Sequence, residues 1–112
     1  MLTFSGHELV VGGHGWNAEH PVLAALLVEG VVCVILDFMT FPCGQQAANL
    51  RGYSRTGEPL WVAEHPTNST TDYYVSLEGV GDDGHLLVGN FAGFRCRVDP
   101  GSGRLLRCEF TK

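Results

Sequence analysis

The stretch PVLAALLVEGVVCVILDF, residues 21–38, is the most apolar part of this chain. Glu29-Gly30 interrupts it at its middle and Asp37 stands near its end, which makes it a poor transmembrane segment. Residues 23–27 are rich in alanine and leucine and would suit a helix. The run at 31–36 is strongly β-branched, however, which favours strand. We therefore predict two buried strands joined by a turn at Glu29-Gly30.

The rest of the chain is also expected to form strands. Glycines, of which the chain has 15, and short turn clusters recur every eight to twelve residues. This spacing predicts a single all-β domain over residues 1–112. The longest irregular segments are expected at 13–21 and 64–72. The expected strands lie near residues 2–5, 8–12, 22–28, 31–38, 49–54, 59–64, 73–79, 85–91, 94–98 and 105–110.

The predicted strands group into two antiparallel four-stranded meanders, at residues 22–64 and 73–110. Turn clusters at Gly81-Asp82-Asp83-Gly84, at Ala92-Gly93 and at 99–103 separate the strands of the second meander. We expect the two meanders to form a sandwich, an open barrel or a propeller-like pair of blades.

The last hairpin can be tested for register. Pairing Phe94 with Phe110 places Cys96 opposite Cys108, Val98 opposite Leu106 and Arg95 opposite Glu109. One face is then apolar and the other charged, which favours this register. We predict that Cys96 and Cys108 face each other in the core as free thiols.

Two family resemblances are found, and the first is based on these turns. The stretch DDGHLLVGNFAGFRCRVDPGSGRLL, residues 82–106, resembles a blade of a pyrroloquinoline-quinone-type β-propeller, whose hairpins carry an x-D-x-x-T-G-x-x-L-W motif. In this stretch Asp99, Gly103 and Leu106 match the motif, while Arg107 stands where tryptophan is usual. In the first meander Gly57, Leu60 and Trp61 match, and no aspartate stands at the corresponding position. The resemblance implies the local strand pattern and no activity, quinone or calcium site. The overall design also resembles small bacterial immunity proteins, the partners of secreted toxins.

The charge and the N-terminus limit the classes of partner and compartment. The net charge is −5, from 12 acidic residues against 7 lysines and arginines, so a nucleic-acid backbone would be repelled and a basic protein attracted. The start, MLTFSGHELV, lacks the pattern of a signal peptide. We expect a cytoplasmic protein that contacts neither nucleic acid nor membrane and that keeps its four cysteines reduced.

Residues capable of chemistry are present but are not arranged in a known motif. His7, His14 and His20 lie near the N-terminus without zinc-site spacing, so no metal and no cofactor is predicted. Cys43, beside Pro42 and Gly44, is the cysteine that suits an exposed nucleophile, with a histidine as its base. An enzyme or metal-binding protein that uses these residues is the alternative to a non-enzymatic binding module, and a structural module completed by dimerisation is another.

The segment EHPTNSTTDYY, residues 64–74, is the longest polar excursion, and it ends in two tyrosines. Tyrosine is large and amphipathic, which makes it a good contact residue. We predict that this loop and the 81–84 turn form one acidic face that binds a basic protein such as a toxin. We expect Trp61 in the core and Trp16 to be open to a partner. The residues assigned to the binding face are Glu64, Asp72, Tyr73, Tyr74, Asp82 and Asp83.

Overall fold

The structure is a computed structural model and describes residues 2–42, 44–67, 69 and 71–110. It confirms the all-β fold and every predicted strand, including the strand at 22–28 that could have been a helix. It adds a strand at His14–Asn17, inside a segment predicted to be irregular, and a short 3₁₀ helix at Phe38–Thr40. The strands are β1 (Leu2–Ser5), β2 (Glu8–Val11), β3 (His14–Asn17), β4 (Val22–Val28), β5 (Val31–Leu36), β6 (Leu50–Tyr53), β7 (Pro59–Val62), β8 (Tyr74–Val80), β9 (Leu86–Asn90), β10 (Phe94–Val98) and β11 (Leu105–Phe110).

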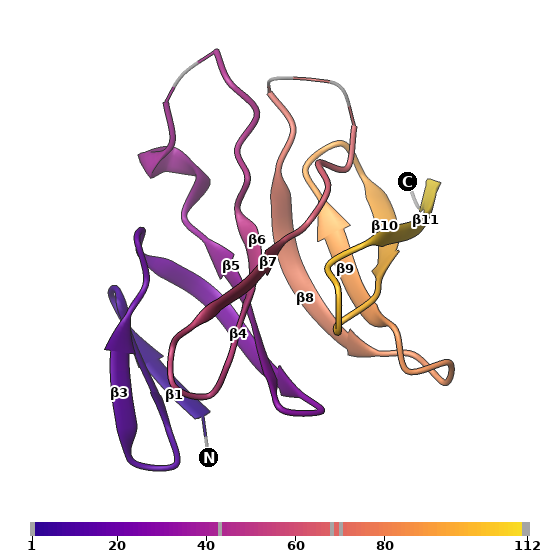
Figure 1. The fold of residues 1–112 in the computed structure, drawn as a ribbon. Coiled ribbons are helices and arrows are strands. Elements are labelled where there is room, and N and C mark those ends of the chain that lie inside the picture. The colour runs from indigo at the N-terminus through magenta and orange to yellow at the C-terminus, as the bar shows by residue number, and fades with distance from the viewer. Residues whose placement is uncertain (1, 43, 68, 70, 111–112) are drawn as a thin grey trace.

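These strands form three antiparallel sheets, one more than the sequence predicted. Sheet A has the order β1-β2-β3, sheet B the order β4-β5-β6-β7, and sheet C the order β11-β10-β9-β8. The first strand of each sheet contacts the first strand of the next, β1 against β4 and β4 against β8, so the sheets spread like a fan from these strands (Figure 1). Each sheet keeps two edge strands in the described part of the chain, so none of the three is closed into a barrel.

Sheet B is the middle layer and is buried on both faces. Along β5, Cys33 and Ile35 pack into the core shared with sheet C, whereas Val32, Val34 and Leu36 pack into the core shared with sheet A. All five side chains are fully buried. The β-branched run therefore forms the central strand of the molecule, and its successive side chains pack alternately into the two cores. Its turn also forms as predicted, because Glu29 and Gly30 both adopt the positive φ of a two-residue hairpin.

The last hairpin keeps most of the predicted register and changes at its turn. Phe94 pairs with Phe110, Arg95 with Glu109 and Cys96 with Cys108. A bulge after Arg97 then places Leu105, and not Leu106, opposite Val98. The prediction for Leu106 was wrong, and this side chain is exposed.

The prediction of free thiols at the same hairpin was also wrong. Cys96 and Cys108 form a disulfide across the strand pair. Their Cα atoms lie 4.0 Å apart, so the opposition that the register predicted already places the two sulfurs within bonding reach. Cys33 is a buried free thiol, and burial raises its pKa to about 12, which keeps it protonated and unreactive.

Tryptophans in the last strands of sheets A and B hold the following sheet in place. The indole Nε1 of Trp61 in β7 donates a hydrogen bond of 2.9 Å to the carbonyl of Pro100 in the β10–β11 turn. Trp61 is buried, as predicted. Trp16 in β3 packs at a tilt against Tyr53, with ring centroids 4.7 Å apart, and also packs against Gly57, so it is not the open contact residue that the sequence suggested.

The outer faces of the stack are polar. On sheet C, Leu87 shares its face with Arg97, and ion pairs join Arg95 to Glu78 and Arg97 to Asp83. On sheet A, Glu8 lies opposite Asn17, and both are exposed. Such faces do not favour a further sheet on either side. The described residues contain no helix of the length and apolarity needed to cross a membrane.

Candidate functional site

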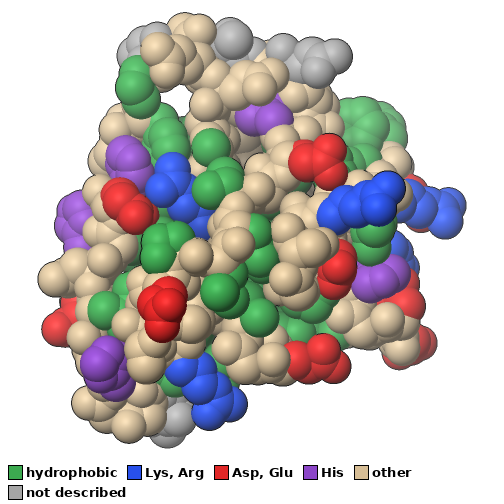
Figure 2. All heavy atoms as spheres, in the orientation of Figure 1, with side chains coloured by type: hydrophobic (Ala, Val, Ile, Leu, Met, Phe, Trp, Pro, Cys, Tyr) green, Lys and Arg blue, Asp and Glu red, His purple; other side chains and the backbone are tan. Residues whose placement is uncertain are grey.

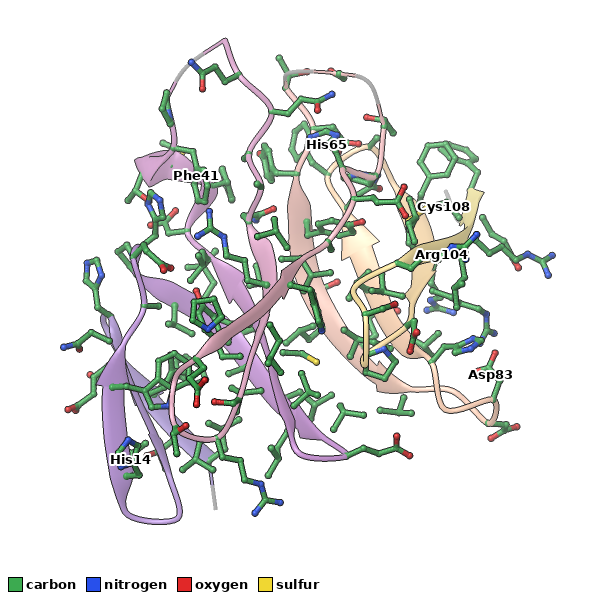
Figure 3. All side chains as sticks on the ribbon, viewed as in Figure 1. His14, Phe41, His65, Asp83, Arg104 and Cys108 are labelled. Atoms are coloured by element: carbon green, nitrogen blue, oxygen red, sulfur yellow. A yellow bond between two sulfur atoms is a disulfide. The ribbon has the colours of Figure 1, made fainter. Side chains whose placement is uncertain are left out.

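Three connections meet at one end of the fan, which we call the loop end. They are the β5–β6 connection (37–49), the β7–β8 connection (63–73) and the β9–β10 turn (91–93). Figure 3 shows Phe41 and His65 at this end, at the top of the view, and Asp83 far below them at the opposite end of sheet C.

Asp72 links two of these connections. Its side chain is buried and accepts hydrogen bonds from the hydroxyl of Thr67, the side-chain amide of Asn90, and the backbone N–H groups of Tyr73 and Ala92. A carboxylate that accepts several such bonds is held firmly and in turn fixes its donors. Asp72 therefore ties the β7–β8 connection to the β9–β10 turn.

Asn49 performs the same task between sheets B and C. This fully buried amide donates to the carbonyls of Leu36 and Tyr74 and accepts from the backbone N–H of Tyr74, at 2.8 to 3.1 Å. The Tyr74 hydroxyl donates to the carbonyl of Glu64 at 2.8 Å, and burial raises the pKa of this hydroxyl, so it stays protonated as a donor. Cross-links of this kind give irregular connections a defined shape.

Aromatic side chains cover this network. The Tyr73 ring stacks between Phe38 and Phe91, with centroid distances of 3.6 Å and 5.1 Å. Phe91 is 60% exposed, and Met39, beside Phe38 on the 3₁₀ helix, is 78% exposed. The aromatic surface, defined here as Phe38, Met39, Tyr73 and Phe91, is therefore apolar and open to solvent. It rests on the hydrogen-bond network of the connections beneath it. Large apolar residues held in this way are typical of protein contact sites.

A cup of about 180 Å³ lies beside the aromatic surface. Phe38, Phe41 and Tyr73 are among the residues around it, together with the buried Ala47 and with Thr71. None of its described lining residues is charged. It therefore suits an uncharged group.

The Phe41 wall of the cup is held from behind. His20 stacks on the Phe41 ring at a centroid distance of 4.0 Å, and the Arg51 guanidinium lies 5.7 Å from the centroid of the same ring. Burial and the nearby Arg51 charge lower the pKa of His20, which favours a neutral imidazole in this stack.

Only part of the predicted binding face is available for contact. Glu64 is exposed, and its carboxylate accepts a hydrogen bond from the backbone N–H of Leu105. Tyr73 is half-buried and belongs to the aromatic surface. Asp72 and Tyr74 are buried and act within the structure, so their assignment as contact residues was wrong. The sequence pattern could not tell an exposed tyrosine from the core tyrosine next to it.

Asp82 and Asp83 do not join the other four residues. They occupy the β8–β9 turn, and the seven residues of β8 separate them from Tyr73, a length of roughly 23 Å. Asp83 is also engaged locally, because its carboxylate lies 2.8 Å from Arg97 and 3.1 Å from His85. A hydrogen bond from the His85 backbone, together with Arg97, holds the pKa of Asp83 below its ordinary value. The single acidic face predicted from the sequence is therefore not formed.

Of the three histidines considered for metal binding, two are held by hydrogen bonds of their own and the third is exposed. His20 hydrogen-bonds with Thr40, His7 donates to the carbonyl of Ala18, and His14 lies at the far tip of sheet A (Figure 3). Among the described residues, no group of three histidine, cysteine or acidic side chains is arranged to hold a metal ion. Cys43 lies outside the described residues, so its role as a nucleophile stays a prediction.

Comparison with known proteins gives one match. Residues 1–110 match the family model described as "Domain of unknown function (DUF7957)". The chain belongs to this family. No curated protein and no solved structure matches it. The resemblances to propeller blades and to immunity proteins therefore remain predictions, and the site rests on its own geometry.

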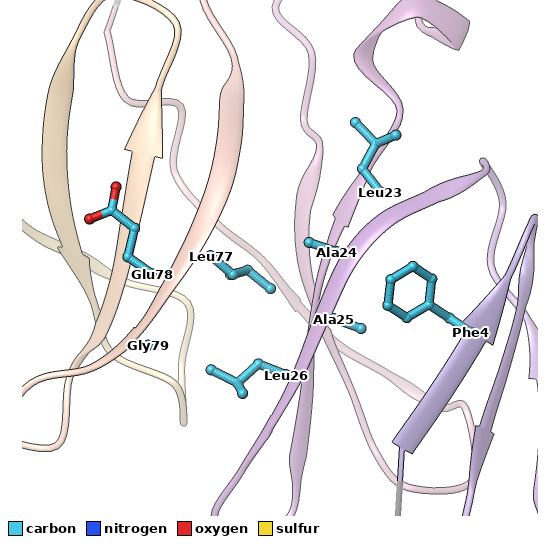
Figure 4. Close-up of a pocket in the computed structure, with 8 residues that line it drawn as sticks. All are labelled: Phe4, Leu23, Ala24, Ala25, Leu26, Leu77, Glu78 and Gly79. Atoms are coloured by element: carbon cyan, nitrogen blue, oxygen red, sulfur yellow. The ribbon is translucent and has the colours of Figure 1, made fainter.

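A second hollow lies where the first strands of the three sheets meet. It is a groove of about 320 Å³ between Phe4 of β1, Leu23 and Leu26 of β4, and Leu77 of β8 (Figure 4). Glu78 is the charged residue at its edge and pairs with Arg95 at 2.7 Å. The groove is open and apolar, so it is the competing location at which an apolar ligand can bind.

Phe38, Met39 and Phe91 were not predicted from the sequence as contact residues. A signal was present, because DFMTFP (37–42) and NFAG (90–93) place large apolar residues in connections, where small and polar residues are typical. An apolar side chain in a tight turn has little core to enter. Such residues are therefore candidates for an exposed contact surface.

Proposed function

We propose that this protein is a non-enzymatic binding module and that the aromatic surface is its contact face for a protein partner. The observation that carries the proposal is the exposure of Met39 and Phe91 above a cross-linked set of loops. A rigid apolar face loses little conformational entropy on binding, which favours affinity. Phe38 and Tyr73, each stacked in the same ladder, supply the pre-organised centre of the face.

The charge distribution supports a basic partner. Residues 1–50 carry four acidic residues and no lysine or arginine, whereas the seven basic residues all lie in residues 51–112. Acidic and basic side chains are interspersed on the face shown in Figure 2, and the arginines of sheet C are paired with acids. Residues 1–62, which form sheets A and B, carry five acidic residues against Arg51 and Arg55, so the part of the chain that supplies Phe38 and Met39 has a net negative charge. Such a field speeds the approach of a positively charged protein.

The specific role that we propose is that of an immunity protein that neutralises a basic bacterial toxin. A small module with a rigid apolar contact face and a negative charge is suited to blocking a positively charged protein. The protein encoded next to this chain is the partner to test first. Capture of that protein by the purified chain, with loss of its activity on binding, is the expected result.

Alanine substitutions locate the contact face. Phe91→Ala and Met39→Ala should each weaken partner binding by about tenfold or more, because exposed anchors of this kind are typical hot spots. Phe110→Ala is the matched control, since Phe110 is also 62% exposed but lies on sheet C, in edge contact with Phe94. Surface plasmon resonance measures the affinities, and thermal denaturation checks that each variant is folded.

Three outcomes would contradict the proposal. Equal binding by Phe91→Ala and Phe110→Ala would remove the aromatic surface as the contact face. A stronger effect of Asp82→Lys than of Phe91→Ala would move the contact to the opposite end of β8. An association rate that does not fall with added salt would exclude a basic partner.

A further inference from the structure

The cup beside the aromatic surface has the size of a single ring. Its volume is about 180 Å³, and an apolar cavity of about 150 Å³ is large enough to take up benzene. A cup of this size cannot enclose a peptide segment, but it can enclose one large side chain. Hot-spot contacts in protein complexes commonly consist of one such anchor in one such pocket.

The side chains that line the cup favour an aromatic and uncharged anchor residue. Three of them are aromatic, namely Phe38, Phe41 and Tyr73, and aromatic pairs gain from edge-to-face or offset stacking. A lysine or arginine at this place would leave its charge without a carboxylate, because no charged residue lines the described part of the cup. The neutral state of His20 behind Phe41 adds no charge either.

The cup is also formed in advance. Phe41 is fixed by His20 and Arg51, and Tyr73 is fixed by Phe38 and Phe91. Gln46, next to the buried Ala47, donates a hydrogen bond to the carbonyl of Thr67 and so joins the two connections that form the cup. Met39 at the mouth is flexible and can adapt to the ring that enters.

We propose that the cup receives one uncharged aromatic side chain, such as phenylalanine, from the protein partner. This inference rests on the proposed function, because it names the group that the partner inserts beside the aromatic surface. The charge of a basic partner would then act around the contact, while the anchor itself is neutral.

The test uses the whole chain and needs no partner. N-acetylphenylalanine amide is titrated into the protein, and the methyl signals of Ala47 and Thr71 are followed by NMR. We expect saturable shifts at these methyls with a dissociation constant of about 1 mM, the usual strength of a fragment of this size. N-acetyllysine amide should produce no saturable shift at either methyl.

Thr71→Trp places a ring at the mouth of the cup and should weaken binding of the phenylalanine probe at least tenfold. Thr56→Trp is the matched control, because Thr56 is an exposed threonine in the β6–β7 turn, away from the cup. Thermal denaturation verifies that both variants fold. For a variant that does not fold, Thr71→Leu replaces Thr71→Trp at the same position.

Three results would overturn the inference. The first is the absence of a saturable shift in the wild-type protein up to the solubility of the probe, and the second is a shift of the Phe4 and Leu77 signals of the groove in Figure 4 in place of those of the cup. The third is equal binding of the probe by Thr71→Trp and Thr56→Trp. Failure here leaves the Phe91→Ala result unaffected, whereas loss of the contact face leaves the probe result unaffected, so the two proposals fail separately.

Discussion

Sheets B and C are both four-stranded meanders, yet their faces have different surroundings. Sheet B is covered by sheet A on one face and by sheet C on the other, so Val34 and Ile35, which point in opposite directions, are equally buried. Sheet C is covered on one face only. Its Leu86 is fully buried, while its neighbour Leu87 shares the outer face with Arg97. The same topology can therefore serve as a central layer or an outer layer, depending on its polar residues.

A glycine followed four residues later by a tryptophan occurs in sheets A and B but not in sheet C. Glycine precedes tryptophan by four residues at Gly12 and Trp16 and again at Gly57 and Trp61. At the third place Arg107 follows Gly103. Trp16 packs against Gly57 of the next sheet, and Trp61 packs against Gly103 of the sheet after that. Sheet C is followed by no further sheet in the described chain, which explains why arginine can replace tryptophan there.

The largest expected effect tests whether sheet B is buried on both faces. Ile35→Ala and Leu36→Ala should each cost about 2–5 kcal/mol of unfolding free energy, because the two side chains fill different cores. In sheet C, Leu86→Ala should cost about as much, and Leu87→Ala less than about 1 kcal/mol. Chemical denaturation measures all four. A small effect of Leu36→Ala would show that sheet A does not form a core with sheet B.

The disulfide joins the edge strand β11 of sheet C to its neighbour β10. β11 is an edge strand whose polar face makes its ion pair within the strand, between Arg107 and Glu109. Reduction, or Cys108→Ser, should cost about 3 kcal/mol, as expected for a short closed loop. The Cys33→Ser variant is the control, and its stability should still depend on reductant.

The state of the cysteines can be checked directly. Mass spectrometry of an unreduced digest should yield one linked peptide that contains Cys96 and Cys108. A count of four free thiols in the purified protein would contradict this disulfide and would restore the prediction made from the sequence. A disulfide that persists would favour an oxidising compartment over the predicted cytoplasm.

The contacts between sheets can be tested at three glycines that share positive φ angles. Gly12→Ala should cost about 1–2 kcal/mol, because alanine is strained at φ +56° but meets open space. Gly57→Ala and Gly103→Ala should cost about 1–3 kcal/mol more, since the new Cβ would lie 2.6 Å from Trp16 or 2.5 Å from Trp61. Equal costs at all three glycines would argue against the tryptophan contacts. Urea denaturation gives the comparison.

The smallest effect concerns the polar edge between sheets A and B. The Tyr53 hydroxyl donates a hydrogen bond of 2.7 Å to Glu19, and this bond, aided by Arg51, lowers the pKa of Glu19. A lowered folded-state pKa stabilises the fold above the ordinary value of 4.5, and this contribution is lost as the pH falls through the folded value. Tyr53→Phe should cost at most about 1 kcal/mol at pH 7, because Glu19 is half exposed and screened.

The stability difference between wild type and Tyr53→Phe is expected to depend on pH. This difference should shrink as the pH falls below 4.5 and through the lowered folded-state pKa of Glu19. Thermal melts at several pH values measure it. A difference that is constant over this range would mean that the Tyr53 hydroxyl does not act through the Glu19 carboxylate.

Much of the fold could be predicted from local patterns. The alternation in residues 94–98 and 105–110 predicted the pairing of Cys96 with Cys108, and the Glu29-Gly30 turn was recognised from its residues alone. The candidate site was predicted poorly. Tyr73 was found, but Asp72 and Tyr74 were placed on the surface although both are buried. Adjacent polar residues in a connection look alike in the sequence, because their burial depends on what other connections cover them.

The sequence by itself determined the class of secondary structure, the turns and most of the strand register. These depend on neighbours within a few residues or directly across a hairpin, where the two-residue period and glycine conformation act locally. Only the tertiary structure decided that sheet B is a central layer, that the thiols of Cys96 and Cys108 are joined, and that Phe38, Tyr73 and Phe91 form one surface. Alternation shows that two faces of a strand differ, but the packing of distant segments determines what each face meets.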